Sequence, residues 1–165
     1  MLLKELEINM ADRIGDTAEV PMTVCFVCSG NTCRSPMAAA VLNYLGKGKY
    51  RAVSAGTCAC DGDGITENAA LALQRMGIPS EGSHDYRNHR ARSVRYSDMA
   101  HADMIVGMTS RHTLQLISAF PEFAEKIRNM PCEVPDPFMH GETVYDKCLN
   151  MITDGIRELF ALGDG

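Results

Sequence analysis

The sequence predicts an α/β fold in which helices cover both faces of a parallel sheet. Short apolar segments alternate along the chain with longer segments whose apolar residues recur at the helical period. This alternation is typical of β-α-β units, which build parallel sheets between two layers of helices. With 165 residues, the chain is long enough to bury a core of ordinary size.

Four segments are predicted to be strands: residues 22–28, 50–54, 103–108 and 126–130. The first of them, MTVCFVC, is apolar and partly β-branched, as expected of a buried strand. Helices are predicted at residues 33–45, 66–76, 97–102, 109–120 and 142–162. Pro36 favours a helix start just before it, whereas Gly77 and Pro79 favour the end of the second helix. The last helix carries an apolar stripe along residues 144–160.

Composition and charge exclude several classes of function. The formal net charge of −5 argues against a nucleic-acid binder. No apolar run approaches the roughly 20 residues of a membrane span, and the N-terminus lacks the pattern of a secretory signal, so we expect a cytoplasmic protein. The seven cysteines are odd in number and irregularly spaced, which favours free thiols. Residues 1–20 are predicted to be an N-terminal extension of unknown role, and residues 21–165 a single domain.

Residues 28–34, CSGNTCR, lie at the predicted turn from the first strand into the first helix. Ligands of open α/β sheets bind at the carboxyl ends of strands, and a helix N-terminus attracts anions. A loop with the spacing C-x5-R can wrap around a tetrahedral oxyanion, with its N–H groups inward and Arg34 gripping two oxygens. The same field favours the thiolate form of Cys28. The segment therefore predicts an anion site that carries a nucleophile.

The residues around Cys28 support this interpretation. Ser35 can donate a hydrogen bond to the thiolate. Gly30 and Asn31 are the residue types that best tolerate a positive φ, which a tight anion cradle demands. Cys25 is instead predicted to be buried in the strand, as cysteine commonly is.

Two other uses of such a loop fit the sequence less well. A nucleotide-binding loop needs G-x-x-x-x-G-K-[ST], and here the second Gly and the Lys are missing. A zinc site could use Cys25, Cys28 and Cys33, but Cys25 and Cys28 would face opposite sides of a strand, and no second C-x2-C follows. We therefore expect no metal site.

Asp136 is the candidate general acid, because displacement of a phosphoryl group requires a proton for the leaving group. It lies between Pro135 and Pro137 in a loop that follows the fourth predicted strand. Two prolines restrict the backbone and can aim the carboxyl group over a pocket. The alternative is a proline-rich turn with a purely structural role. The presence of the C-x5-R-S loop in the same chain favours the catalytic role over this alternative.

Together these segments resemble the low-molecular-weight protein tyrosine phosphatase family. The resemblance rests on CSGNTCRSPMA at residues 28–38, VSAG at 53–56, ADMIVGMTSRH at 102–112 and DPF at 136–138. It implies a doubly wound domain with a four-stranded parallel sheet, so that residues 21–165 would be a phosphatase domain. It also implies a mechanism without metal or cofactor, in which Cys28 attacks phosphorus, Arg34 holds the oxygens, and Asp136 protonates the leaving group and later activates water.

The resemblance implies further site residues by matching position. Asn31, Ser35, Ser54 and His89 match a polar network that holds the loop in shape. Cys33 matches a cysteine that can form a reversible disulfide with the nucleophile; the alternative is a packing residue at the helix start. His84, His101, His112 and His140 receive no role. The residues expected to bind substrate or phosphate are Ser29, Gly30, Asn31, Thr32, Cys33, Ser35 and Phe138.

The resemblance implies that the substrate is a phosphorylated protein, in which the residue that loses its phosphoryl group is either phosphotyrosine or phosphoarginine. Thr32 stands where tyrosine phosphatases of the family typically have Ile and where the bacterial arginine phosphatases have Thr. Residues 57–64 carry no aromatic side chain, so Phe138 alone would contact a phenyl ring. Both features favour phosphoarginine, whereas the prevalence of phosphotyrosine activity in the family favours the other.

Two other functions fit the sequence less well. The family's arsenate reductases need two further cysteines after the second helix, and residues 77–131 have none. A non-catalytic oxyanion-binding module would have lost Cys28, Arg34 or Asp136, and all three are present.

We expect the protein to be a monomer or a weak dimer.

Overall fold

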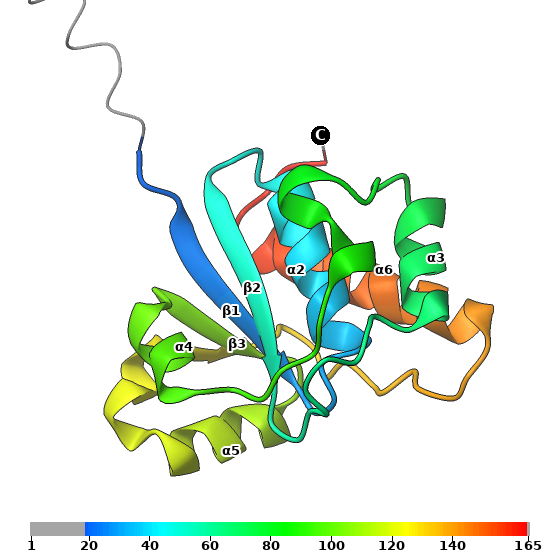
Figure 1. Cartoon of the computed structure of the whole chain (residues 1–165). Helices are drawn as coiled ribbons and strands as arrows, with labels where there is room; N and C mark the ends of the chain where they lie inside the picture. The colour runs from blue at the N-terminus through cyan, green and yellow to red at the C-terminus, as the bar shows by residue number, and fades with distance from the viewer. Residues whose placement is uncertain (1–18, 165) are drawn as a thin grey trace, which may run out of the picture.

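The computed structural model describes residues 19–164, and strands alternate with helices along them (Figure 1). The predicted extension, residues 1–20, lies outside the described residues except for its last two. Three short 3₁₀ segments, η1 to η3, were not predicted. The elements are β1 (Met22–Cys28), α2 (Arg34–Leu45), β2 (Tyr50–Gly56), α3 (Glu67–Arg75), η1 (Gly82–His84), η2 (Tyr86–Asn88), α4 (Tyr96–His101), β3 (Met104–Gly107), α5 (Ser110–Ala119), η3 (Pro121–Lys126), β4 (Ile127–Asn129) and α6 (Glu142–Leu159).

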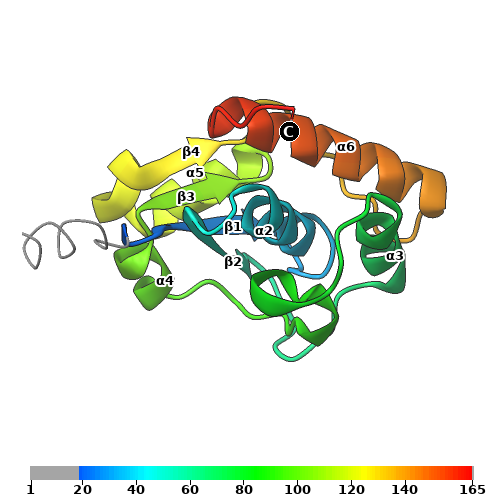
Figure 2. The same ribbon diagram turned by 90° about the horizontal axis from the view of Figure 1, so that it is seen from above.

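The four strands form one parallel sheet in the order β2-β1-β3-β4, which Figure 2 shows from β2 to β4. The chain builds outward from β1 to β2, and then crosses to the other side of β1 to add β3 and β4. The strand order therefore reverses between β1 and β3. In sheets of this kind the crevice beyond the carboxyl ends of the strands at the reversal is the favoured place for a ligand. The predicted doubly wound, four-stranded fold is confirmed.

Alternate side chains of β1 enter two separate cores, because successive residues of a strand point to opposite faces. Val24, Phe26 and Cys28 pack with α2, α3 and α6, whereas Cys25 and Val27 pack with α4 and α5. Figure 1 shows these two groups of helices on opposite sides of the sheet. Burial on both faces explains why β1 reads as a continuous apolar run.

The helix ends follow local sequence signals. Thr66 and Thr109 cap α3 and α5, each accepting a hydrogen bond from the backbone N–H three residues later. Gly77, just beyond α3, has φ of +88°, a conformation that favours glycine. Among the described residues, no helix has the length and apolar character required to cross a membrane.

Candidate active site

Cys28 is the last residue of β1, at the point where the strand order of the sheet reverses. Its side chain is buried, and its Sγ lies 3.0 Å from Oγ of Ser35 in the first turn of α2. The loop that joins β1 to α2, residues 29–33, thus brings the thiol of Cys28 and the hydroxyl of Ser35 together. The structure places this predicted pair in contact.

The carbonyl groups of the loop are bonded to its surroundings. Those of Cys28 and Ser29 accept hydrogen bonds of 2.8 and 2.9 Å from the N–H groups of residues 57 and 58, and the carbonyl of Thr32 accepts one of 2.9 Å from Thr66. In a trans peptide the N–H points away from the carbonyl of the preceding residue. The N–H groups of residues 29, 30 and 33 therefore point away from residues 57, 58 and 66, as an oxyanion site inside the loop would require.

Asn31 holds the loop in its bent shape. It is fully buried and has φ of +56°, so the predicted positive φ is confirmed at this residue. Its Nδ2 donates to Oγ of Ser35 and of Ser54, both at 2.9 Å, and its Oδ1 accepts from the N–H of Arg92 at 3.0 Å. Its carbonyl accepts from Nε2 of His89 at 2.7 Å, which fixes a proton on that nitrogen. The four residues of the predicted polar network are thus in direct contact.

The expectation of a positive φ was wrong for Gly30, because among the described residues Gly30 is not one of those with positive φ. Gly56, the last residue of β2, meets a stricter steric demand. A Cβ on it would overlap the carbonyl oxygen of Ser29 and lie 3.1 Å from Cβ of Asn31. The end of β2 therefore packs directly under the loop, which requires glycine there.

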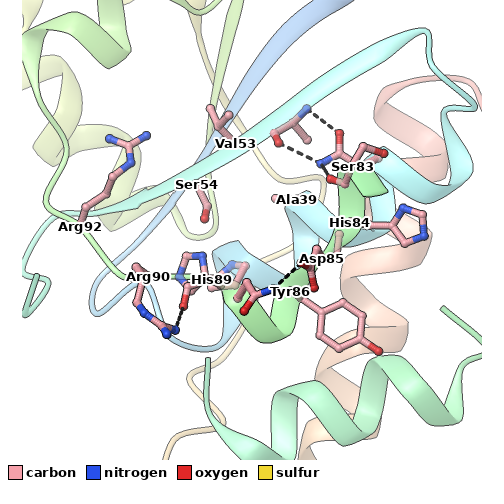
Figure 3. Close-up of a pocket in the computed structure, with 15 residues that line it drawn as sticks. Ala39, Val53, Ser54, Ser83, His84, Asp85, Tyr86, His89, Arg90 and Arg92 are labelled. Carbon is pink, nitrogen blue, oxygen red and sulfur yellow. Dashed lines mark hydrogen bonds between the residues drawn. The ribbon is translucent and has the colours of Figure 1, made fainter. Parts of the chain in front are cut away.

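Ser54, His89 and Arg92 also line a cavity of about 270 Å³ between α2, β2 and the segment 83–92 (Figure 3). All three hydrogen-bond Asn31. Burial lowers the pKa of His89 below its ordinary value, with smaller contributions from Arg92 and Arg90 and an opposing one from its hydrogen bond to Asn31, so the neutral ring is favoured. A neutral His89 supports the loop without adding charge to it.

Arg34 and Asp136 meet at the open side of the loop. Arg34 is buried, and its Nη1 donates to the carbonyl of Val134 at 3.1 Å. Its Nη2 lies 3.7 Å from Oδ2 of Asp136, whose side chain is 57% exposed. Oδ1 of Asp136 accepts the N–H of Phe138 at 3.0 Å, which orients the carboxyl group. The loop after β4 thus brings Asp136 to the guanidinium, more than 100 positions along the chain.

A cavity of about 120 Å³ lies between the loop and Asp136. This volume suits a group as small as a phosphoryl group. Phe138 is 54% exposed at its rim, and Thr32 is partly exposed. The residues that line it are Cys28, Gly30, Asn31, Thr32, Cys33, Arg34, Asp136 and Phe138, all of which are predicted site residues.

Cys33 is buried against the core as well as lining this cavity. Its Sγ lies 3.3 Å from the hydroxyl of Tyr145 and 3.4 Å from Oγ1 of Thr66. Burial raises the pKa of Tyr145 to about 12, so its phenol stays protonated. Cys25 lies in the opposite core from Cys28, as the spacing predicted, and burial raises its pKa to about 12. Within residues 19–164, no three His, Cys, Asp or Glu side chains gather as a metal site would require.

His112, to which the sequence analysis gave no role, also contacts the loop. Its Nε2 lies 2.8 Å from Oγ of Ser29, and its Nδ1 lies 2.9 Å from Oγ1 of Thr109. The sequence held one signal for it. Residues 109–112 follow β3, whose carboxyl end is at the same edge of the sheet as that of β1.

Comparisons with known proteins agree with this geometry. The sequence model described as "Low molecular weight phosphotyrosine protein phosphatase" matches residues 23–162. A protein-arginine-phosphatase of Geobacillus stearothermophilus is 31% identical over 133 residues, which cover 76% of this chain and 85% of the relative. A low molecular weight protein-tyrosine-phosphatase of Streptomyces coelicolor is 31% identical over 156 residues, which cover 84% and 91%. The crystal structure of a low molecular weight protein tyrosine phosphatase from T. tengcongensis aligns with a TM-score of 0.78 at 34% identity, over 85% of this chain and 98% of that one. The chain belongs to the low molecular weight phosphotyrosine protein phosphatase family.

Proposed function

We propose that this protein hydrolyses phosphorylated side chains of proteins through a phosphocysteine intermediate on Cys28. The observation that carries the proposal is the position of this sulfur. It lies in the cavity enclosed by the loop, with the guanidinium of Arg34 and the carboxyl of Asp136 at the same cavity. A nucleophile, an oxyanion clamp and a proton donor are the parts that phosphoryl transfer requires.

In the first step the thiolate of Cys28 attacks phosphorus. The inward N–H groups of the loop and the guanidinium of Arg34 hold the three equatorial oxygens, where negative charge accumulates in the transition state. Asp136, on the open side of the cavity, gives its proton to the leaving oxygen or nitrogen as the bond to phosphorus breaks.

In the second step water attacks the phosphocysteine and Asp136, now a carboxylate, takes a proton from that water. The sulfur of Cys28 leaves as a thiolate. Ser35, 3.0 Å from the sulfur, donates a hydrogen bond to it, which stabilises the leaving group. Inorganic phosphate then leaves the loop. The proposed cycle uses only side chains of this chain and water.

Phosphotyrosine and phosphoarginine are both candidate substrates, since relatives with either name match this chain at 31% identity. The cavity favours phosphoarginine. Thr32 lines it with a hydroxyl-bearing side chain, and Phe138 is its one aromatic lining residue. A phenyl ring gains most from apolar contact on both faces, whereas a guanidinium nitrogen gains from a hydrogen-bond partner.

The proposed function is tested with Cys28→Ser and para-nitrophenyl phosphate. The serine hydroxyl is a far weaker nucleophile than a thiolate, so turnover should vanish while inorganic phosphate still binds. The matched control is Cys25→Ser, in the opposite core, which lacks any contact with the cavity. Wild-type turnover by Cys28→Ser would overturn the mechanism. Inhibition of the wild-type protein by a chelator would point to a metal instead.

A further inference from the structure

His112 joins the start of α5 to the loop around Cys28. It is the third residue of α5, and only 3% of its surface is exposed. Its ring lies between two hydroxyl groups, with Nδ1 2.9 Å from Oγ1 of Thr109 and Nε2 2.8 Å from Oγ of Ser29. Both ring nitrogens therefore have a partner, and Ser29 is connected through the ring to a residue 80 positions later in the chain.

The ring can make both bonds in its neutral form. A hydroxyl group can donate or accept, so either tautomer gives each nitrogen a suitable partner. Burial is the main cause that lowers the pKa of His112 to about 4, and the cations Arg34 and Arg111 contribute to this shift. The acids Asp136 and Glu133 oppose this shift only in part. At neutral pH the ring thus holds Ser29 without placing a second cation beside Arg34.

Ser29 is held from two sides. Its carbonyl accepts the N–H of Cys58 at 2.9 Å, and its side chain contacts His112. These two contacts restrict the peptide between Ser29 and Gly30, whose N–H points away from Cys58 and so, in the proposed site, toward the bound oxyanion. Without the bond to His112, the backbone bond alone would leave this peptide freer to rotate, and an inward N–H would be lost from the oxyanion site for part of the time.

We propose that His112 is a positioning residue, which acts through the hydroxyl of Ser29 to keep the loop closed around an oxyanion. The inference rests on the proposed function of the loop as the phosphoryl site. It concerns a different contact from those that carry the function, so the two can fail separately.

The sharpest test compares His112→Gln with His112→Asn. The amide nitrogen of Gln reaches about as far as Nε2 and can still donate to Ser29. That of Asn stands near the position of Nδ1, so it keeps Thr109 within reach but not Ser29. We expect His112→Gln to stay within about threefold of wild type, and His112→Asn to weaken inorganic phosphate as a competitive inhibitor by roughly tenfold, with a similar fall in kcat/KM. His101→Asn, on the exposed side of α4, is the control and should change neither.

A double-mutant cycle with Ser29→Ala separates positioning from general damage to the fold. If His112 acts through Ser29, His112→Asn should add almost nothing in the Ser29→Ala background. Additive losses, or equal phosphate inhibition constants for the Gln and Asn variants, would overturn the inference. If the wild-type protein does not turn over, the proposed function fails instead. Calorimetric titration with inorganic phosphate would then compare the same variants and decide the positioning role alone.

Discussion

The hydroxyl of Ser35 lies between the sulfur of Cys28, at 3.0 Å, and the side-chain amide of Asn31, at 2.9 Å. Asn31 can only donate through Nδ2, so the serine oxygen accepts that bond and its own hydrogen is free to point elsewhere. Two acceptors are within reach of this hydrogen: Cys28 and, less closely, the carbonyl of Ala55 at 3.4 Å. The amide of Asn31 thus orients the hydroxyl of Ser35 toward the nucleophile.

Ser35→Ala should therefore lower kcat for para-nitrophenyl phosphate by about 10- to 100-fold, because a hydrogen bond to a charged group contributes roughly 1.5 to 3 kcal/mol. Alkylation of Cys28 by iodoacetate at neutral pH should slow as well. Ser54→Ala is the matched control, since it removes the other acceptor of Asn31 but does not touch the sulfur. Equal losses in the two variants would mean that Ser35 supports the loop only through Asn31.

Gly56 gives a prediction about the support of the loop by β2. In Gly56→Ala the new Cβ would overlap the carbonyl oxygen of Ser29, so the loop or the strand end must move. We expect a loss of roughly 1 to 3 kcal/mol in the free energy of unfolding, measured in urea, and at least a tenfold loss of kcat/KM. Gly163→Ala, whose Cβ would meet nothing within 4 Å, should be close to neutral. Full activity in Gly56→Ala would show that the loop tolerates displacement here.

The sequence predicted the sheet and the main helices from signals within a few residues, and it predicted the residues that line the small cavity from the C-x5-R loop together with the family resemblance. The run MTVCFVC marks a strand buried on both faces, and C-x5-R spans one loop. The 3₁₀ segments η1 and η2 depend on distant contacts instead. For example, Nδ2 of Asn43 in α2 donates to the carbonyl of Ser83 in η1 at 2.8 Å, a contact that spans 40 positions.

His112 was missed for the same reason. Its contact with Ser29 spans 83 positions and exists only because β1 and β3 are neighbours in the sheet. The expectation for Gly30 failed because glycine tolerates a positive φ but does not require one. At Asn31 the positive φ is stabilised by the four hydrogen bonds that its side chain and carbonyl make to Ser35, Ser54, Arg92 and His89.

The lowered pKa of His112 also predicts how the free energy of unfolding depends on pH. Its pKa is about 4 in the folded protein, mainly because of burial, and about 6.5 in an unfolded chain. The unfolded state therefore binds the proton first as the pH falls. The stability that neutral His112 contributes above about pH 6.5 is lost progressively as the pH falls toward 4.

The measurement is urea unfolding of wild type and His112→Gln at pH 7 and at pH 4.5. Gln does not titrate, and all other groups cancel in the comparison. We expect the stability of wild type relative to the variant to fall by roughly 1 to 3 kcal/mol between the two pH values. A difference that stays constant with pH would contradict the neutral, buried state of His112.

Asp136→Asn tests the proton donor. Asn keeps an oxygen that can accept the N–H of Phe138, so the loop geometry is retained. The variant cannot give up a proton, so we expect a loss of about 10²-fold or more with phenyl phosphate and a smaller loss with para-nitrophenyl phosphate, whose leaving group needs less protonation. Asp154→Asn, on the exposed side of α6, should match wild type. Equal losses with both substrates would place Asp136 in a purely structural turn.

The proposed preference for phosphoarginine depends on Thr32. It lines the cavity beside Cys33, with Oγ1 3.8 Å from that sulfur, and it is only partly buried. A polar side chain here can meet a guanidinium nitrogen, whereas Ile would present apolar surface to an aryl ring. We expect wild type to have the higher kcat/KM for a phosphoarginine peptide than for a phosphotyrosine peptide of the same sequence context. Thr32→Ile should shift that ratio toward phosphotyrosine by about 10- to 100-fold, which corresponds to one lost hydrogen bond to a charged group.

Thr143→Ile makes the same change at an exposed position of α6 and should leave the ratio unaltered. A wild-type preference for phosphotyrosine that Thr32→Ile leaves unchanged would show that this position does not set the specificity.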